Sequence, residues 1–558
     1  MSPPGTKSSP SLPDAKPPLT LSAMADRAWH RVTEAALNTG WTPVARLAEA
    51  AVVALMQNIT VGQLRVLTFS HIYTFPIPEP GNRSQNANPR PDLKAELRVV
   101  NDSFWVRLCT MSDLGFAEAY MYGDVECDDL VTLFEMFLEN RENLSNLNSR
   151  LSYLFTLPQK ITTYRFLNTI GNSRSNISAH YDISNDMFAG MSTLVMDLGS
   201  IVMNSILGFL SEDMTYSCAI FPELDGDLST NKRGQGKWSG GQSLKRLAQP
   251  EEPVTPESES DTQTAVDIDL FFENGSDPLY DAQIRKLQHI IDKLHIPITS
   301  VSGSPVRLLE IGTGWGALAI RVAEQYPHVQ IDTITLSSEQ KKLAENRIAA
   351  RGLSERIRVH LMDYRNMPAE WEGRFARFVS VEMIEAVGRE FLQEYWRVVD
   401  WAMEKKGAVG VVQVITIPEA RFERYIREID FIRKWIFPGG FLPTLTFLMT
   451  TLTAGSSGTL VTESIENIGP HYARTLREWR RRFVQKFESH IVPALQKEYA
   501  ERSGQTTKKL GRDEIEVFRR KWLYYYCYCE VGFTTRTLGD HIVTFMREGN
   551  RTYGCDVY

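Results

Sequence analysis

Apolar and polar positions alternate with two different periods in the C-terminal half of the chain. Short, nearly continuous apolar runs predict buried strands, and runs with an apolar residue every three or four positions predict amphipathic helices. In order, these runs read VRLLEIG, GALAIRVAEQY, VQIDTITL, SSEQKKLAENRIAARG, IRVHLM, FARFVSVEMI and AVGVVQVITI. Such alternation predicts a doubly wound α/β domain with a parallel sheet, whose ligands bind at the carboxyl ends of the strands.

The first part of the chain has a mixed pattern. Helical runs (VARLAEAAVVALMQNI, LVTLFEMFLENRENL) accompany strand-like runs (VGQLRVLTF, AELRVVNDSFWVRLC), which predicts a smaller mixed α/β domain in residues 41–165. Residues 1–40 begin with a stretch rich in Pro, Ser and Lys, and residues 223–275 are polar and bear Gly, Ser and Pro. Both segments are expected to be disordered, because they have little apolar surface to offset the entropy of ordering.

Length, net charge and cysteine content indicate the number of domains and the class of protein, but they do not identify a function. A chain of 558 residues exceeds what one hydrophobic core usually holds, so two or more domains are expected. A formal net charge of −7 gives no overall attraction to nucleic acid or anionic lipid. Two basic runs, 474–482 and 519–521, are either solvated faces or local anion sites. The six cysteines lack metal-ligand spacing, which favours a reducing compartment and no metal site.

The first predicted strand of the α/β domain ends in a glycine-rich turn. Glu310 is followed by Gly312, Gly314 and Gly316, and the chain then enters a helix. Glycines let the backbone approach a ligand closely, and a helix N-terminus offers unpaired N–H groups to an anion. The spacing alone is equally typical of a structural turn, but the strand before it and the helix after it favour a cofactor site.

Two further strand ends carry polar side chains. Ser337 and Gln340 have the spacing of a capping box, so Gln340 either caps the next helix or contacts a ribose. Asp363 follows the third strand, where it either begins a turn or accepts a hydrogen bond from an adenine amino group.

Eight stretches occur in the order found in one protein family. They read HYDISND, MTYSCAIF, LLEIGTGWGALAI, ITLSSEQ, MDYRNMP, SVEMIEAVG, WIFPGGFLP and NIGPHYARTLREWRRRF. From about Asp113 to Glu548 the chain therefore resembles the cyclopropane-fatty-acyl-phospholipid synthases of the S-adenosylmethionine-dependent methyltransferase superfamily, and most closely their plant and fungal branch. The resemblance implies a Rossmann-like class I methyltransferase domain in residues 276–558, a lid segment for cofactor and substrate in residues 166–222, and a lipid-docking N-terminal domain.

The resemblance also implies S-adenosylmethionine as cofactor and a bicarbonate ion as the base. The positions that match the family's cofactor ligands, together with the strand end before the turn, are Tyr181, Tyr216, Ser217, Glu310, Gly312, Gly314, Gly316, Thr335, Gln340 and Asp363. The positions that match its bicarbonate ligands are Cys218, Glu385, Tyr472 and Ile417.

Two positions depart from the family pattern. Bacterial members carry His where this chain has Ile415, and Gln413, on the same face of the strand, is expected to supply the missing hydrogen bond. Ala386 stands where the family usually has His after its Glu.

The reaction that the resemblance implies places physical demands on the site. An isolated alkene is a poor nucleophile, so the sulfonium methyl group must be held against the double bond. Water must be excluded from the resulting carbocation until a base removes a proton and the ring closes. Aromatic rings stabilise a cation, although ordinary core packing is the alternative for each candidate. The candidates are Tyr181, Phe188, Tyr216, Trp435, Phe437 and Phe441.

Two of the implied residues have plain structural alternatives. Cys218 is either a buried packing residue or a pocket wall that donates its backbone N–H, and Glu385 is either a surface helix cap or part of the base pocket.

The expected substrate is an unsaturated phospholipid in a membrane, reached from the cytoplasm by transient peripheral contact. The runs FIRKWIFPGGFLPTL and REWRRRF are expected to supply an apolar mouth and phosphate-binding arginines. No nucleic acid partner is expected, and a homodimer is compatible with the resemblance. Open alternatives are a methyl-branched product, a sphingolipid substrate, or an inactive lipid-binding homologue.

An apolar, Met-rich run in residues 191–208 does not fit the family pattern. It contains Asp197 among several polar residues, whereas a bilayer-spanning helix needs about 20 predominantly apolar residues, so an anchor is not expected. Deleting the run restores MFAGFLSEDMTYSC, which matches the family without a gap. The run is either a lid helix or a translated, unspliced intron, because codons for the Gly-Met-Ser at its start can contain the intron-like sequence GTATGT.

Overall fold

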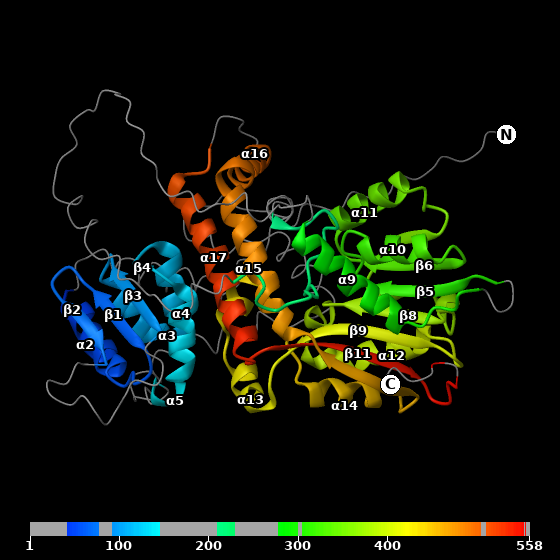
Figure 1. Ribbon diagram of the computed structural model, residues 1–558, viewed down its shortest axis with the longest axis horizontal. Coiled ribbons are helices and arrows are strands. Elements are labelled where there is room, and N and C mark those ends of the chain that lie inside the picture. The colour runs from blue at the N-terminus through cyan, green and yellow to red at the C-terminus, as the bar shows by residue number, and fades with distance from the viewer. Residues whose placement is uncertain are drawn as a thin grey trace, which may run out of the picture.

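The computed structural model describes residues 42–76, 92–144, 209–228, 277–299, 304–503, 509–551 and 553. Within these residues the chain forms two sheets of different size, with long helices between them (Figure 1). Several predictions lie outside the described residues: the tail 1–40, Tyr181, Phe188, the run 191–208, and most of 223–275.

The smaller sheet belongs to the N-terminal part of the chain and has the strand order β2-β1-β3-β4. Its strands are β1 (Gln63–Leu67), β2 (Ile72–Phe75), β3 (Lys94–Val99) and β4 (Val125–Cys127). The helices of this part are α2 (Thr42–Met56), α3 (Ser103–Tyr122), α4 (Leu130–Glu139) and α5 (Arg141–Leu144). The mixed α/β pattern predicted for this region is therefore present.

One predicted strand in this region is half wrong. The run AELRVVNDSFWVRLC was expected to be extended, but β3 stops at Val99 and α3 begins at Ser103. The side chain of Asn101 accepts a hydrogen bond from the Ser103 N–H at 3.1 Å, so the Asn-Asp-Ser turn starts a helix. Phe104 and Trp105 are buried as helix residues rather than as strand residues.

The larger sheet has seven strands in the order β10-β11-β9-β8-β5-β6-β7. The parallel strands are β5 (Val306–Ile311), β6 (Val329–Thr335), β7 (Ile357–Leu361), β8 (Arg377–Val381) and β9 (Val409–Thr416). Two antiparallel strands, β10 (Leu460–Asn467) and β11 (Gly539–Arg547), extend the sheet at one edge. This confirms the predicted doubly wound α/β domain, with each strand predicted between residues 306 and 417 in place.

Helices cover both faces of this sheet. They are α9 (Pro278–Lys293), α10 (Ala317–Gln325), α11 (Ser338–Ala350), α12 (Leu392–Ala402) and α14 (Leu445–Gly455). Helix α13 (Glu419–Arg427) follows β9 and has no buried residue. Leu308 and Val411 share a core with α9 and α10, whereas their neighbours Leu309 and Val412 share a separate core with α12 and α14. The strands are therefore buried on both faces, which explains their nearly continuous apolar sequences.

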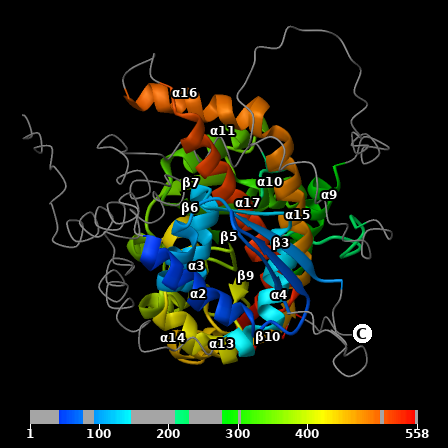
Figure 2. The ribbon, with the colours of Figure 1, turned by 90° about the vertical axis from the view of Figure 1, so that its left-hand side faces the viewer.

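Two long helices, α15 (Gly469–Lys486) and α17 (Arg512–Thr534), lie between the two sheets, and the shorter α16 (Val492–Ser503) lies at the top of the molecule (Figures 1 and 2). The ring of Tyr524 in α17 lies 5.0 Å from that of Phe134 in the N-terminal part, and Tyr526 lies 5.6 Å from Phe483 in α15. Helix α17 thus contacts both parts of the molecule. Among the described helices, none is long and apolar enough to cross a membrane.

Candidate active site

The glycine turn adopts a backbone that other residues rarely take. Gly312, Gly314 and Gly316 have φ angles of 104°, 51° and 84°, in the left-handed region that favours glycine. A Cβ atom at Gly312 would lie 3.2 Å from the Cβ of Met383, whereas one at Gly314 would meet no atom within 4 Å. The turn therefore packs against the end of β8 on one side and leaves its backbone open on the other.

The segment that carries Tyr216, Ser217 and Cys218 is tied to this turn. Arg347 of α11 donates one hydrogen bond to the carbonyl of Trp315 in the turn, at 2.7 Å, and another to the carbonyl of Asp213, at 3.0 Å. The segment is thereby fixed beside the carboxyl edge of the sheet.

The polar residues predicted to contact the cofactor also bond to one another. Glu310 accepts a hydrogen bond from the Thr333 hydroxyl at 2.6 Å, and burial raises the pKa of Glu310 to about 8. The Thr335 hydroxyl donates to the side-chain oxygen of Gln340 at 2.8 Å, and the Gln340 N–H donates to Ser337 at 3.2 Å. Ser337 thus caps helix α11, while the Gln340 side chain bonds within the strand end rather than completing a capping box.

Asp363 begins a turn, the structural alternative considered above. It accepts a hydrogen bond from the Arg365 N–H at 2.9 Å and forms an ion pair with the Arg365 guanidinium at 2.6 Å. Burial acts to raise the pKa of Asp363, but the hydrogen bonds and charge of Arg365 outweigh it and lower that pKa. An ionised Asp363 keeps acceptor capacity beyond these bonds.

The side chain on which the site converges is Glu382, directly after strand β8. Its Oε1 accepts hydrogen bonds from the Cys218 N–H and the Gln413 amide, both at 2.8 Å. Its Oε2 accepts one from the Tyr472 hydroxyl at 2.6 Å. Glu382 is half-buried, and its φ of 46° places a non-glycine residue in the left-handed region. The structure therefore brings Cys218, Gln413 and Tyr472 together around a carboxylate that the sequence analysis did not consider.

Two more buried charged residues belong to this cluster. The Gln413 amide donates a second hydrogen bond to Asp540 at 2.8 Å, and the Lys286 ammonium donates to the Ser217 hydroxyl at 2.7 Å. Burial, and then the charge of Glu382, raises the pKa of Asp540 well above its usual value. Burial lowers the pKa of Lys286, although the charge of Glu382 opposes this. Burial raises the pKa of Glu382 as well, and the hydrogen bonds from Cys218 and Tyr472 and the charge of Lys286 oppose this. Since Glu382 has more donors than Asp540, we assign the negative charge of this acid pair to Glu382.

Glu385, the predicted base-pocket acid, lies one turn further on at the same edge. Its Oε1 accepts the N–H of Ile415 at 2.6 Å, and its Oε2 has no hydrogen-bond partner among the described residues. Burial, and then the charge of Glu382, raises the pKa of Glu385 to about 8, so Glu385 is largely protonated at neutral pH. Its carbonyl accepts the N–H of Phe441 at 2.8 Å, which holds that aromatic residue at the site.

Aromatic rings form a wall beside these acids. The Tyr216 hydroxyl lies 3.2 Å from that of Tyr525, and the Tyr216 ring lies 4.9 Å from the Trp479 ring. The ring of Phe437 lies 6.3 Å from that of Tyr525. Phe437 and Tyr216, predicted from different parts of the sequence, therefore both lie near Tyr525. The ring of Phe441 instead packs with those of Phe422 and Phe447, at 6.0 and 5.8 Å.

The donors predicted to hold a bicarbonate ion are already engaged. Cys218, Gln413 and Tyr472 donate to Glu382, and the Ile417 N–H donates to the carbonyl of Pro443 at 3.0 Å. The N–H that reaches an acid of the site is that of Ile415. The residues present therefore do not fit a bicarbonate ion at these donors.

Three residues of the cluster were not predicted from the sequence: Glu382, Asp540 and Lys286. Glu382 had a usable signal, because it is the first residue after a buried strand and lies at the ligand-binding edge. Asp540 and Lys286 are far from it in sequence, and only the fold brings them close.

The arginines of the two basic runs are paired within the protein. Arg477 and Arg480 contact Asp227 and Glu530 at 2.6 and 3.0 Å, and Arg519 contacts Glu516 at 2.8 Å. Arg481 and Arg482 likewise pair with acids. These ion pairs use the side chains that the sequence suggested for binding phosphate.

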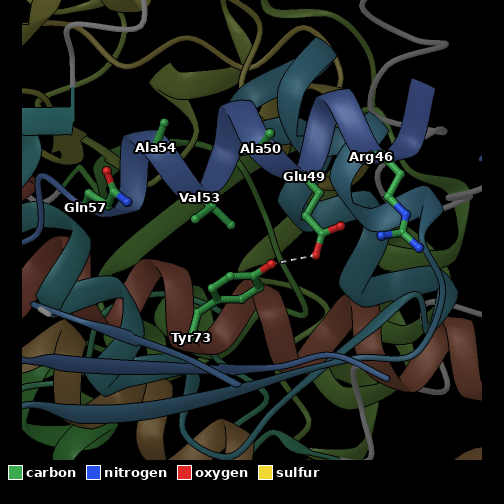
Figure 3. A pocket seen from close by; sticks show the side chains of 7 residues that line it. All are labelled: Arg46, Glu49, Ala50, Val53, Ala54, Gln57 and Tyr73. Carbon is green, nitrogen blue, oxygen red and sulfur yellow. Dashed lines mark hydrogen bonds between the residues drawn. The ribbon is translucent and has the colours of Figure 1, made fainter. Parts of the chain in front are cut away.

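An open groove lies apart from this site, in the N-terminal part. Figure 3 shows it between α2 and β2, where the Tyr73 hydroxyl donates to Glu49 at 3.1 Å. Figure 1 places these elements at the opposite end of the molecule from β6 and α10. The groove contains none of the predicted site residues.

Comparison with known proteins identifies the family. The family described as mycolic acid cyclopropane synthetase matches residues 269–539. The tuberculostearic acid methyltransferase UfaA1 of Mycobacterium tuberculosis is 30% identical over 509 residues, which cover 91% of this chain and 96% of that relative. The chain belongs to this family. It is an S-adenosylmethionine-dependent methyltransferase, and the family's members modify lipids.

Two further proteins are similar to this chain. The cyclopropane-fatty-acyl-phospholipid synthase of Escherichia coli is 27% identical over 455 residues, which cover 81% of this chain and 88% of that enzyme. The solved structure of the cyclopropane synthase MmaA2 from Mycobacterium tuberculosis is 20% identical, with a TM-score of 0.43, over 67% of this chain and 97% of that one.

Proposed function

We propose that this methyltransferase adds the methyl group of S-adenosylmethionine to the double bond of an unsaturated phospholipid acyl chain and closes a cyclopropane ring. The observation that supports this most directly is the Glu382 cluster beside the glycine turn. Ring formation needs a base that removes one proton from the new methyl group, and Glu382 is a half-buried carboxylate held by three donors.

The glycine turn fits the cofactor. Its backbone at Gly314 faces open space, and Gly316 stands at the N-terminus of α10, where unpaired N–H groups favour a carboxylate. Residues proposed to hold S-adenosylmethionine are Tyr216, Ser217, Glu310, Thr335, Gln340, Asp363 and the three glycines, with Tyr181 outside the described residues. When bound, S-adenosylmethionine supplies an electrophilic methyl group.

The aromatic wall fits a reaction that passes through a cation. Rings at Tyr216 and Phe437 present π faces that attract positive charge, and their apolar surfaces exclude water that would quench it.

Access to a phospholipid requires contact with a membrane surface, and the N-terminal part is proposed to provide it. Leu47 on α2, Phe69 in the β1–β2 hairpin and Ile72 in β2 are 72%, 107% and 61% exposed. Exposed apolar side chains at one end of the molecule are suited to shallow insertion among lipid headgroups.

A second candidate is a methyl-branched product. It is favoured by the similarity, along almost the whole chain, to a relative whose name describes a methyltransferase rather than a ring-forming enzyme. Both reactions begin with the same methyl transfer, and they differ in how the cation loses its charge.

Analysis of lipids from expressing cells tests these candidates. The enzyme is expressed in a host that makes unsaturated phospholipids but no cyclopropane or methyl-branched lipids. An upfield three-membered-ring proton signal by NMR is the expected result, and a branched acyl chain by chromatography supports the second candidate. Unchanged phospholipid acyl chains would contradict both candidate products. A modified sphingolipid in the same extract would identify a sphingolipid, not a phospholipid, as the substrate.

A further inference from the structure

We propose that the carboxylate of Glu382 is itself the base of this enzyme and takes the place of a bound bicarbonate ion. The inference rests on the proposed methyl transfer and adds to it the identity of the proton acceptor. It starts from the disagreement described above between the implied ion and the donors that are present.

The hydrogen-bond donors that a bicarbonate ion would use are already occupied. A small planar anion in this site would use the Cys218 N–H, the Gln413 amide and the Tyr472 hydroxyl, and all three already bond to the two oxygens of Glu382. A second anion would find these donors taken and would be repelled by the Glu382 charge at short range. The side chain therefore provides the same planar CO₂⁻ group that an ion would bring.

Glu382 also lies close to the glycine turn. Met383, the next residue, packs against Gly312 of the turn, so the Glu382 backbone is next to the proposed cofactor site. Its φ of 46° is a strained conformation for glutamate, and strain of this kind persists where surrounding contacts enforce it.

The charged groups around Glu382 favour one negative charge on its carboxylate. Gln413 joins Glu382 to the protonated Asp540, and the buried Lys286 is close enough to both acids to stabilise one negative charge among them. The cluster is thus arranged to keep Glu382 ionised while Asp540 stays neutral, and Glu382 can take up one proton.

The proton-transfer step balances with these groups. A C–H bond of the transferred methyl group breaks, and its electron pair forms the C–C bond that closes the ring at the cationic carbon. The proton bonds to an oxygen of Glu382, which becomes a neutral carboxylic acid. Release of the product returns this proton to solvent and restores the carboxylate.

Glycine is the informative substitution at this position. Glu382→Gly removes the carboxylate and also suits the positive φ, so it is expected to fold and to leave the three donors free. Glu382→Gln keeps the shape of the side chain and fills the same space without a basic oxygen. Glu394→Gln, at an exposed ion pair with Arg397, is the matched control outside the site.

The test uses the full-length enzyme, S-adenosylmethionine and unsaturated phospholipid vesicles in carbonate-free buffer, with and without added bicarbonate. The wild type is expected to work equally well in both buffers. Both Glu382 variants should lose about 10²–10⁴-fold in rate, the range of a general base. Bicarbonate should restore part of the activity to Glu382→Gly but none to Glu382→Gln.

Binding of ¹³C-bicarbonate, followed by NMR, gives a readout that needs no turnover. Glu382→Gly is expected to bind the ion, and the wild type and Glu394→Gln are not. Bicarbonate binding by the wild type, or wild-type activity that depends on bicarbonate, would overturn the inference. A wild type that modifies no lipid in either buffer would contradict the proposed function instead, and the NMR titration would still decide on Glu382.

Discussion

Tyr472 holds Glu382 through one short hydrogen bond, while its ring stacks on Phe533 at 4.5 Å. Tyr472→Phe keeps the stacking and removes only the donor. A hydrogen bond to a charged group contributes about 1.5–3 kcal/mol, so we expect the methyl-transfer rate to fall roughly 10- to 150-fold with little change in thermal stability.

The pH dependence of Tyr472→Phe separates this role from simple packing. Loss of a donor to the carboxylate raises the pKa of Glu382, so the acidic limb of the pH–rate profile should move to higher pH. Tyr73→Phe, the same change in the groove of Figure 3, is the matched control and should move neither rate nor profile. An unshifted profile in Tyr472→Phe would contradict the assigned contact.

Glu310 predicts a pH dependence of stability. Its pKa is about 8 in the folded protein because of burial, against 4.5 for an exposed glutamate. The folded state therefore holds a proton that the unfolded state has lost between about pH 4.5 and 8, so the free energy of unfolding decreases as pH rises through this window. We expect Glu310→Gln to reduce this slope, with a gain of at most a few kcal/mol near pH 8. Urea unfolding at pH 5.5 and 7.5 measures the free energy of unfolding of both proteins. An equal change of this free energy with pH in the wild type and Glu310→Gln would refute the raised pKa of Glu310.

Three of the residues that the sequence predicted for the site lie together in the structure. Cys218, Gln413 and Tyr472 were each predicted, and they meet at one carboxylate. The motif SVEMIEAVG contains two glutamates, however. Similarity to a family predicts Glu385 as the acid of the base pocket, whereas the hydrogen bonds of the three donors converge on Glu382. No pattern along the chain shows which of two acids three residues apart will face the donors.

At the scale of secondary structure, periodicity was sufficient wherever an element is buried on a regular face. Strands β5 to β9 and helices α10 and α11 appear where the apolar pattern predicted them. The start of α3 was missed because apolar residues continue across the Asn-Asp-Ser turn, and the turn chemistry, not the hydrophobic period, decides between strand and helix there.

The segment after residues 191–208 allows a prediction about that run. Phe209 is fully buried and packs against Trp479, Trp522 and Tyr526 at ring distances of 5.9, 5.9 and 5.6 Å. The chain is thus firmly placed directly after the run. We expect a variant that lacks residues 191–208 to keep or gain thermal stability and methyl-transfer activity.

Sequencing of mature transcripts provides the companion measurement. If the run is an unspliced intron, transcripts without these codons should be found in the source organism. Loss of activity in the deletion variant, together with transcripts that always contain the codons, would favour the lid helix instead.

At the scale of the whole molecule, helix α17 joins the chemistry to the N-terminal part. Tyr525 faces the site through Tyr216, while Tyr524, the preceding residue, packs against Phe134. Lys434, near the aromatic wall, forms an ion pair of 2.7 Å with Glu118 of α3. The sequence indicated both parts but not this connection, because it depends on residues about 400 positions apart.

This arrangement makes membrane docking separable from catalysis. Phe69 and Ile72 project from the N-terminal sheet, and burial of each large apolar side chain contributes about 1.5–3 kcal/mol when complete. For partial insertion of both, we expect the double variant Phe69→Ser, Ile72→Ser to bind phospholipid vesicles about tenfold or more weakly in sedimentation assays. Ile298→Ser is the matched control, since Ile298 is 89% exposed beyond α9 in the other part of the molecule. Activity on detergent-dispersed lipid should stay unchanged in all variants, because the Glu382 cluster and the glycine turn are untouched. Equal vesicle binding by the double variant and the control would locate the docking surface elsewhere on the protein.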